Sequence, residues 1–236
     1  MQTRSPTSKS RRLTPASLRK GARQLADGDP DLGTVLNRLG EPPMWGREPG
    51  FPALIQIILE QQVSLAAART MYRRLTRHLG AMTPEAVVAI QVSGLRNFGL
   101  TRQKARYCHG LAARILDGSL DLTSVAHGPD EMGREVLSGV PGLGPWSVDI
   151  YYLMALRRPD VWPQGDLALA AALREVKHLD ALPTRDEQQN LASAWAPWRS
   201  VAARILWAHY LAARGKYRSR SDNKAMQSRR SLRSRA

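Results

Sequence analysis

The chain has 236 residues and a formal net charge of +15, from 35 Lys and Arg against 20 Asp and Glu. Its apolar share of 43% is enough for the core of one domain of ordinary size or of two small ones. The single cysteine, Cys108, excludes an intramolecular disulfide and a cysteine-ligated iron–sulfur cluster. No apolar stretch approaches the ~20 residues of a membrane span, and the polar N-terminus carries no secretory signal, so we expect a soluble intracellular protein without a membrane partner.

The positive charge is concentrated at the two ends of the chain. Residues 1–29 contain seven Lys or Arg against two Asp, and residues 214–236 contain nine against one, so the region between them is nearly neutral. Segments this basic and this rich in serine are typical of disordered tails, which attract nucleic acid with a strength that falls as salt rises. We therefore predict basic, disordered tails over residues 1–28 and 214–236, with solubilising ends as the alternative interpretation.

Between the tails, apolar residues recur with helical spacing almost throughout, and strand signals are weak. Several helix starts carry capping residues: Ser64 can cap one helix, Thr83 precedes a proline, and Thr184 and Glu187 form a capping box. The fold class is therefore predicted to be all-α, with helices over residues 52–60, 65–78, 131–138, 145–154, 167–176 and 185–195, from Thr83, from Thr101 to about Gly118, and from about Trp198 to about Gly215.

The most informative stretch joins two of these helices through a turn with the sequence Gly-Val-Pro-Gly-Leu-Gly. Its glycines, Gly139, Gly142 and Gly144, allow positive φ and a close approach of the backbone to a large partner. Pro145 opens the second helix, whose N–H groups and positive dipole end point towards whatever lies above the turn. This arrangement binds phosphate without reading base sequence, so the segment is interpreted as a DNA-binding helix-hairpin-helix motif rather than a plain helical connector.

The hairpin and three further stretches resemble the helix-hairpin-helix DNA glycosylase superfamily, and the four motifs follow one another along the chain in the order found in that family. Within it, residues 29–213 are similar to the 3-methyladenine DNA glycosylase II branch. The three stretches are Ile58–Ser64, Gly99–Lys104 with Tyr107, and Trp195–Ser200 followed by Trp207. The resemblance implies two helical subdomains flanking a cleft, one of about residues 49–158 with the hairpin, the other of about residues 29–48 plus 159–213.

The resemblance also implies a function: a monofunctional DNA glycosylase that hydrolyses the N-glycosidic bond of alkylated purines, such as 3-methyladenine and 7-methylguanine, in base excision repair. Its partner would be double-stranded DNA containing damaged bases, and we expect a monomer that is either cytoplasmic and nucleoid-associated or nuclear. Two alternatives stay open. One is a glycosylase for deaminated or mismatched bases, and the other is a non-catalytic helix-hairpin-helix module that only grips DNA.

The family's catalytic carboxylate matches Asp166, which follows a proline-containing loop downstream of the hairpin. From the residues alone, Asp166 is also expected to be the N-cap of the helix over residues 167–176. A purely structural cap is the other interpretation, but the two roles are compatible because a helix N-terminus favours the ionised carboxylate. A carboxylate beside the sugar stabilises the positive charge that develops there as the glycosidic bond stretches.

Aromatic residues are expected to form the base pocket. The resemblance assigns Trp146 and Trp207 to it and, less directly, Trp45, because aromatic faces stack on a flipped base and attract a cationic one. For any single tryptophan, packing in the core is the competing interpretation, and it is the expected one for Trp162, Trp195 and Trp198. Bifunctional relatives carry a nucleophilic lysine at the position of Trp146, and an indole cannot form a Schiff base, so no lyase activity is expected.

The remaining site residues belong to the DNA-binding set. The turn between residues 60 and 65 resembles the segment that carries the family's minor-groove wedge, so Gln61, Gln62 and Ser64 are expected to contact DNA, with Gln62 as the wedge. Gln61 and Gln62 could instead satisfy backbone groups at the helix junction. No cofactor is required, but the resemblance suggests that the backbone carbonyls of Ser138, Val140 and Leu143 hold a monovalent cation, Na⁺ or K⁺.

Overall fold

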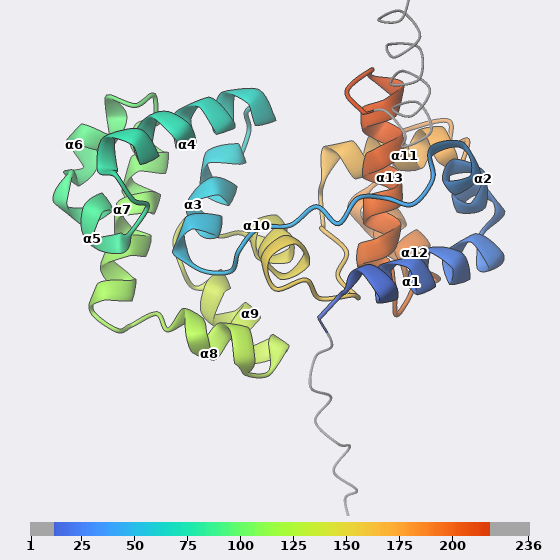
Figure 1. The fold of residues 1–236 in the computed structure, drawn as a ribbon, viewed down its shortest axis with the longest axis horizontal. Coiled ribbons are helices and arrows are strands. Elements are labelled where there is room, and N and C mark those ends of the chain that lie inside the picture. The colour runs from blue at the N-terminus through green and yellow to red at the C-terminus, as the bar shows by residue number, and fades with distance from the viewer. Residues whose placement is uncertain (1–11, 218–236) are drawn as a thin grey trace, which may run out of the picture. The chain divides into compact units, whose positions relative to one another are not determined.

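A computed structural model describes residues 12–217 of the chain, drawn in Figure 1. This part forms two compact units, one consisting of residues 46–157 and the other of residues 12–45 and 158–217. The elements of both units are helices, and within residues 12–217 there is no strand, so the all-α fold class is confirmed. No helix in this range combines the length and the apolar character that crossing a membrane requires.

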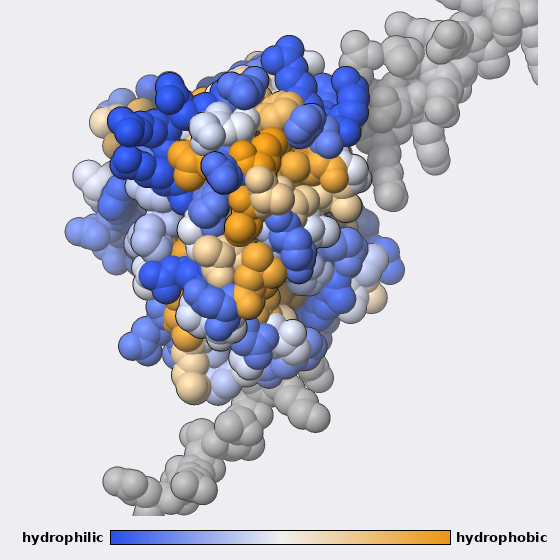
Figure 2. Space-filling model, turned by 90° about the vertical axis from the view of Figure 1, so that its left-hand side faces the viewer, coloured by the Kyte–Doolittle hydropathy of each residue, from blue (hydrophilic) through white to orange (hydrophobic). Residues whose placement is uncertain are grey.

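The unit of residues 46–157 is built around α3 (Phe51–Glu60). Seven of the ten residues of α3 are buried, because it is apolar on all sides, and it packs against α4, α7, α10 and η1. The other elements of this unit are α4 (Leu65–Leu79), α5 (Pro84–Ala89), α6 (Gln91–Arg96), α7 (Arg102–Leu116), α8 (Leu122–His127), α9 (Asp130–Ser138), α10 (Pro145–Ile150) and the π-helical turn η1 (Tyr151–Ala155). Figure 2 shows the face at the left of Figure 1, where a broken band of hydrophobic residues runs between hydrophilic margins.

The second unit is built around α13 (Arg199–Ala213). Nine of its fifteen residues are buried, and all four other helices of the unit pack against it. These helices are α1 (Pro15–Gly28), α2 (Pro30–Leu39), α11 (Leu167–Val176) and α12 (Arg185–Ser193). The chain passes between the two units at residues 45–46 and 157–158, close to the borders that the sequence analysis expected.

The predicted helix starts agree with the structure because they depend on local hydrogen bonds. The hydroxyls of Ser64, Thr83 and Thr101 accept backbone N–H groups in the first turns of α4, α5 and α7. Thr184 and Glu187 form the predicted capping box of α12. These four starts are confirmed to the residue.

The prediction of a disordered tail over residues 1–28 is wrong from Pro15 onward, where α1 begins. The Thr14 hydroxyl caps this helix by accepting the N–H of Ser17 at 3.1 Å, and Leu18, Ala22 and Leu25 are buried on one face. That face packs against α2 and α13, so apolar spacing outweighs the basic composition of the segment. The remaining parts of the two predicted tails lie outside the described residues. These parts are residues 1–11 at the N-terminus and residues 218–236 at the C-terminus.

Residues 214–217, the start of the predicted C-terminal tail, are ordered rather than disordered. They close the end of α13, where the N–H of Lys216 donates to the carbonyl of Leu211 at 2.8 Å. The guanidinium of Arg214 contacts the Glu175 carboxylate at 3.3 Å. A backbone turn and an ion pair to α11 therefore hold this short stretch against the folded unit.

The second helix of the hairpin also differs from the prediction, which expected one α-helix over residues 145–154. The α-helix ends at Ile150, and the chain continues as η1, where the N–H of Leu156 donates to the carbonyl of Tyr151 at 3.1 Å. In this wider helical turn the carbonyl of Met154 is free to face Arg47, and the N–H of Arg47 donates to it at 3.0 Å. The π-helical turn thereby attaches the segment that leads into α3.

Candidate functional site

Asp166 begins α11 in the second unit, as the sequence predicts. Its backbone is extended, and its Oδ1 accepts the N–H of Leu169 at 2.9 Å. Gly165, with φ of 74°, provides the tight turn before it, and the N–H of Asp166 donates to the carbonyl of Pro163 at 3.4 Å. Asp166 is buried, with 8% of the residue's surface exposed. The N-cap prediction is therefore confirmed, with the carboxylate at the positive end of a ten-residue helix.

The indole of Trp207, from α13, reaches the same carboxylate. Its Nε1 donates to Oδ1 of Asp166 at 3.3 Å, and Trp207 is buried, with 9% of the residue's surface exposed. Two N–H groups thus converge on one oxygen, and both stabilise its negative charge. The structure brings together two residues that the sequence analysis assigned to different roles, the carboxylate and a wall of the base pocket.

Trp45 is fixed to the same helix α13 by its backbone. Arg204 is fully buried and donates to the carbonyl of Trp45 at 2.8 Å and to that of Ser200 at 3.2 Å. Arg204 lies about one helical turn before Trp207. The Trp45 ring is half-buried and stands edge-on to Tyr217, with 6.0 Å between ring centroids. One helix therefore positions both aromatic candidates of the second unit.

The other tryptophans of this unit have structural contacts, as expected for them. Trp162 and Trp195 are buried and pack on each other with ring centroids 5.5 Å apart. The indole N–H of Trp198 donates to the side chain of Gln24 in α1 at 2.7 Å.

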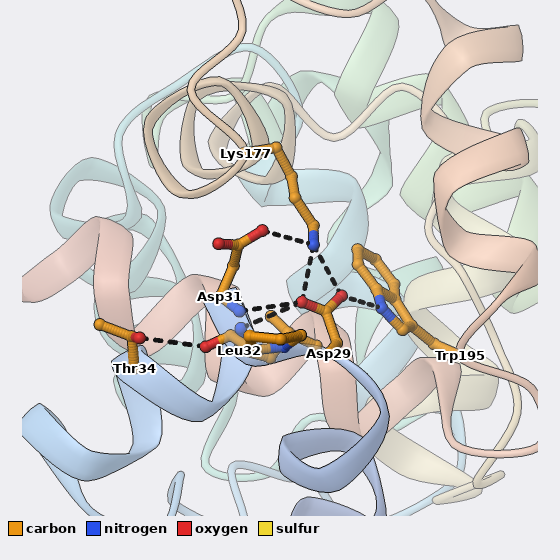
Figure 3. Close-up of polar contacts among 7 residues, drawn as sticks. Asp29, Asp31, Leu32, Thr34, Lys177 and Trp195 are labelled. Carbon is orange, nitrogen blue, oxygen red and sulfur yellow. Dashed lines mark hydrogen bonds and ion pairs between the residues drawn. The ribbon is translucent and has the colours of Figure 1, made fainter.

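Figure 3 shows a polar network around Asp29 in the second unit. Lys177 lies 2.6 Å from Asp29 and 2.8 Å from Asp31, and the Trp195 indole donates to Asp29 at 2.8 Å. Burial by itself raises the pKa of Asp29, but hydrogen bonds from Lys177, Trp195 and the Leu32 N–H outweigh it and lower the pKa below its ordinary value. A pocket of about 670 Å³ beside this network is lined by neither Asp166 nor Trp207, so we assign the network a structural role.

The hairpin belongs to the first unit. Its turn is closed by the N–H of Val140, which donates to the carbonyl of Leu137, and by that of Leu143, which donates to the carbonyl of Val140, both at 3.0 Å. The buried side chains of Val140 and Leu143 anchor the turn from below.

The three hairpin glycines, which the sequence analysis expected to allow positive φ, are not equivalent. Gly142 does, at 94°, whereas φ is −74° at Gly139 and −76° at Gly144. A Cβ on Gly142 would also overlap the Tyr107 ring, while one on Gly144 would meet nothing within 4 Å. Gly142 is thus required by packing inside the unit, and Gly144 is the glycine that leaves open space above the turn.

The side chain of Gln61 is half-buried and is held within the first unit. Its Nε2 donates to the carbonyl of Gly142 at 2.8 Å and to the hydroxyl of Ser147 at 2.9 Å, which braces the turn after α3 against the hairpin. This contact corresponds to the alternative interpretation of Gln61, in which it satisfies groups at the helix junction. Gln62 is exposed and has φ of 56°, so the left-handed turn leaves this side chain at the surface. Ser64 is held in its cap of α4.

A buried lysine supports the same turn. The Nζ of Lys104 donates to the carbonyl of Leu59 at 2.7 Å and to that of Gln61 at 2.6 Å, which satisfies carbonyls at the end of α3. Burial lowers the pKa of Lys104, partly against the effect of Cys108, and raises the pKa of the Cys108 thiol to about 12. Burial thus disfavours the thiolate form of Cys108, and the lysine acts as a cap at the end of α3.

The candidate residues thus fall into two groups. Asp166, Trp207 and Trp45 lie in the second unit, and the hairpin, the Gln61–Gln62 turn and the half-buried Trp146 lie in the first. Sequence reasoning missed Arg204 and Lys104, although a lone arginine among the apolar residues of α13 is a visible signal.

The model of one protein family, described as the HhH-GPD superfamily base excision DNA repair protein, matches residues 55–197. A Mycobacterium tuberculosis relative named "Probable bifunctional transcriptional activator/DNA repair enzyme AlkA" is 32% identical over 211 residues, which cover 78% of this chain and 41% of that protein. The Escherichia coli protein "DNA-3-methyladenine glycosylase 2" is 26% identical over 188 residues, which cover 73% and 64%. The chain thus spans less than two thirds of the length of each.

Among solved structures, the 3-methyladenine DNA glycosylase Mag1 of Schizosaccharomyces pombe, in complex with abasic DNA, superposes with a TM-score of 0.72. It is 22% identical, and the match covers 81% of this chain and 95% of that one. At this identity, the likeness establishes that the two share a fold.

Proposed function

The chain belongs to the HhH-GPD superfamily of base excision DNA repair proteins, and from this membership we propose that it is a DNA glycosylase that removes alkylated purines of the 3-methyladenine and 7-methylguanine type. The observation that carries the proposal is the buried carboxylate of Asp166 at the start of α11, which accepts hydrogen bonds from the Leu169 N–H and from the Trp207 indole. The name of the E. coli relative supports the substrate class.

The reaction requires a group that stabilises a sugar cation. As the bond between C1′ and the purine nitrogen breaks, its electron pair leaves with the base, and positive charge develops on the deoxyribose. An alkylated purine is already cationic, so it departs as a neutral base without a strong general acid. The fixed carboxylate of Asp166 stabilises the cation and accepts a proton from the water that adds to C1′.

In this proposal, Trp207, Trp45 and Trp146 stack on the extruded base. A cationic purine gains from the faces of aromatic rings, and stacking also holds a base that has left the duplex. Trp146 stands where bifunctional relatives carry their nucleophilic lysine. Because an indole forms no Schiff base, the enzyme leaves an intact abasic strand.

DNA binding is assigned to the first unit. The hairpin binds backbone phosphate at the start of α10, with the open space at Gly144 allowing its approach. Gln62 enters the stack in place of the flipped nucleotide. The carbonyls of Ser138, Val140 and Leu143 are neutral hard oxygens that suit Na⁺ or K⁺. The Val140 carbonyl, which accepts the Leu143 N–H, keeps a second lone pair for such an ion. The ion would supply positive charge for a phosphate.

The test is base release by the full chain from duplexes that each contain one lesion: 3-methyladenine, 7-methylguanine, hypoxanthine or a mismatch. Alkaline cleavage of the product is measured separately, to separate glycosylase from lyase activity. Asp166→Asn still caps α11 but carries no charge, so release should disappear while the fold and DNA binding persist. Asp121→Asn is the matched control, because Asp121 caps α8 by accepting the Thr123 N–H at 2.8 Å.

The outcomes separate the possible functions. Release of alkylated purines by the wild type and the Asp121 variant, but not by the Asp166 variant, supports the proposal. Release of hypoxanthine or mismatched bases alone would indicate a glycosylase for deaminated or mismatched bases. Tight binding of DNA without release of any base would indicate a non-catalytic DNA-binding module. Near-normal release by the Asp166 variant would refute the catalytic assignment.

A further inference from the structure

Helix α4 carries three arginines on one face. Arg69, Arg73 and Arg77 follow each other at intervals of four residues, and all three are exposed. At a rise of 1.5 Å per residue, neighbouring arginines stand about 6 Å apart along the helix, and the three span about 12 Å. We call these three residues the α4 arginine stripe.

The stripe has no acidic counterpart. From Gln61 to Pro84 the sequence contains no Asp or Glu, and within residues 12–217 none of the three guanidinium groups forms an ion pair. Other arginines of the same unit are paired, as Arg47 is with Glu60 at 2.6 Å. Like charges four residues apart destabilise a helix, so stability of the fold does not account for the arrangement.

The position of the stripe indicates its partner. Helix α4 starts directly after the turn that holds Gln62, and Ser64 caps it there. Ala66, small and exposed, lies on the same side of the helix and leaves the path from the turn to Arg69 unobstructed. The row of unpaired guanidinium groups begins next to Gln62, the proposed wedge. Such a row can bind successive charges of a linear polyanion that runs past Gln62, and guanidinium groups bind phosphate well.

We propose that the α4 arginine stripe binds the phosphate backbone of the duplex on one flank of the flipped nucleotide. The proposal rests on the proposed function, which supplies the DNA and the position of the wedge. One strand of B-DNA presents a phosphate about every 3.4 Å along the axis, so a stripe of about 12 Å spans three or four phosphates. It adds a sequence-independent contact to the one at the hairpin.

The experiment compares two triple variants of the full chain with equal loss of charge. The first is Arg69→Ala, Arg73→Ala and Arg77→Ala. The matched control is Arg96→Ala, Arg114→Ala and Arg174→Ala, which removes three exposed cations from α6, α7 and α11, outside the basic segments at the two ends of the chain. Binding of undamaged duplex is measured by fluorescence anisotropy over a series of salt concentrations, after circular dichroism and thermal unfolding show that each variant is folded.

The expected result is a loss of about two to three units from the slope of log affinity against log salt in the stripe variant, and of less than one unit in the control. A variant with lysine at all three stripe positions should keep most of the slope. Equal changes in the two alanine variants, or no change in either, would overturn the proposal. So would a stripe variant that loses binding to phosphatidylglycerol vesicles but keeps its DNA slope.

The binding assay and one further measurement separate this proposal from the proposed function. Because the binding assay uses undamaged DNA, it reports on the stripe even if the wild type releases no base. The single-turnover rate of base release at saturating protein should be unchanged in the stripe variant, since the arginines act on binding. A reduced rate at saturation would contradict a role limited to the backbone.

Discussion

Trp207 donates its indole N–H to Oδ1 of Asp166 at 3.3 Å, across a separation of 41 residues. In the proposed mechanism this contact gives Trp207 two functions, because its indole N–H orients the carboxylate while its ring is assigned to stacking on the base. A pocket residue that also orients the catalytic group couples substrate binding to the chemical step.

This coupling is tested by Trp207→Phe, which keeps a ring for stacking and removes the N–H donor. A hydrogen bond to a charged group contributes about 1.5–3 kcal/mol, so we expect a loss of roughly tenfold or more in the single-turnover rate of base release. Trp198→Phe, which removes the indole bond to Gln24, is the control for loss of an indole donor in the same unit. An unchanged rate in the Trp207 variant would show that its N–H does not act on Asp166 during catalysis.

Gln62→Ala should reduce base release from an intact duplex roughly tenfold or more, and much less from a site that is already mismatched. Extruding a nucleotide costs a few kcal/mol of stacking, and a distorted site has already lost part of it. The control is Gln91→Ala, because Gln91 is also exposed and also has positive φ, at 58°, so it reports the cost of strain alone. Equal losses on both substrates would place the wedge elsewhere.

The hairpin glycines should respond differently to substitution. Gly144→Glu should leave the protein folded and weaken binding of all DNA sequences by a similar factor, because its Cβ has free space and its carboxylate would repel phosphate. Gly142→Ala should instead destabilise the fold by about 1–3 kcal/mol, because of its positive φ and the Tyr107 ring. Thermal unfolding and salt-dependent binding measure the two effects, and unchanged affinity in a folded Gly144 variant would contradict phosphate binding at the hairpin.

Asp29→Asn should change how stability depends on pH. The pKa of Asp29 is lowered in the folded state, so its ionised form contributes stability that is present above the ordinary carboxyl pKa and is lost as pH falls through the lower, folded value. At neutral pH we expect the free energy of unfolding of the variant to lie on the order of 2 kcal/mol below that of the wild type, because Lys177 loses its bond to Asp29 and keeps only Asp31. Below about pH 4 the difference between the two proteins should become smaller, because the Asp29 carboxylate of the wild type is then being protonated. Urea unfolding at several pH values checks this, with exposed Asp27→Asn as control, and parallel pH profiles would disprove it.

The sequence by itself determined the features that depend on neighbours along the chain. The caps at Ser64, Thr83 and Thr184 and the N-cap at Asp166 each need only a side-chain oxygen and the N–H groups of the next turn. Helical spacing of apolar residues fixed the all-α class for the same reason.

Only the tertiary structure decided which distant groups meet. Gln61 was predicted to contact DNA. In the structure its side-chain amide donates hydrogen bonds to the carbonyl of Gly142 and to the hydroxyl of Ser147, which the fold brings close to it. Composition made residues 15–28 look like a tail, yet α1 folds because α2 and α13 cover its apolar face. A helix cap forms between residues that are neighbours along the chain. Burial of a side chain depends instead on residues distant in sequence, which only the folded structure brings into contact with it.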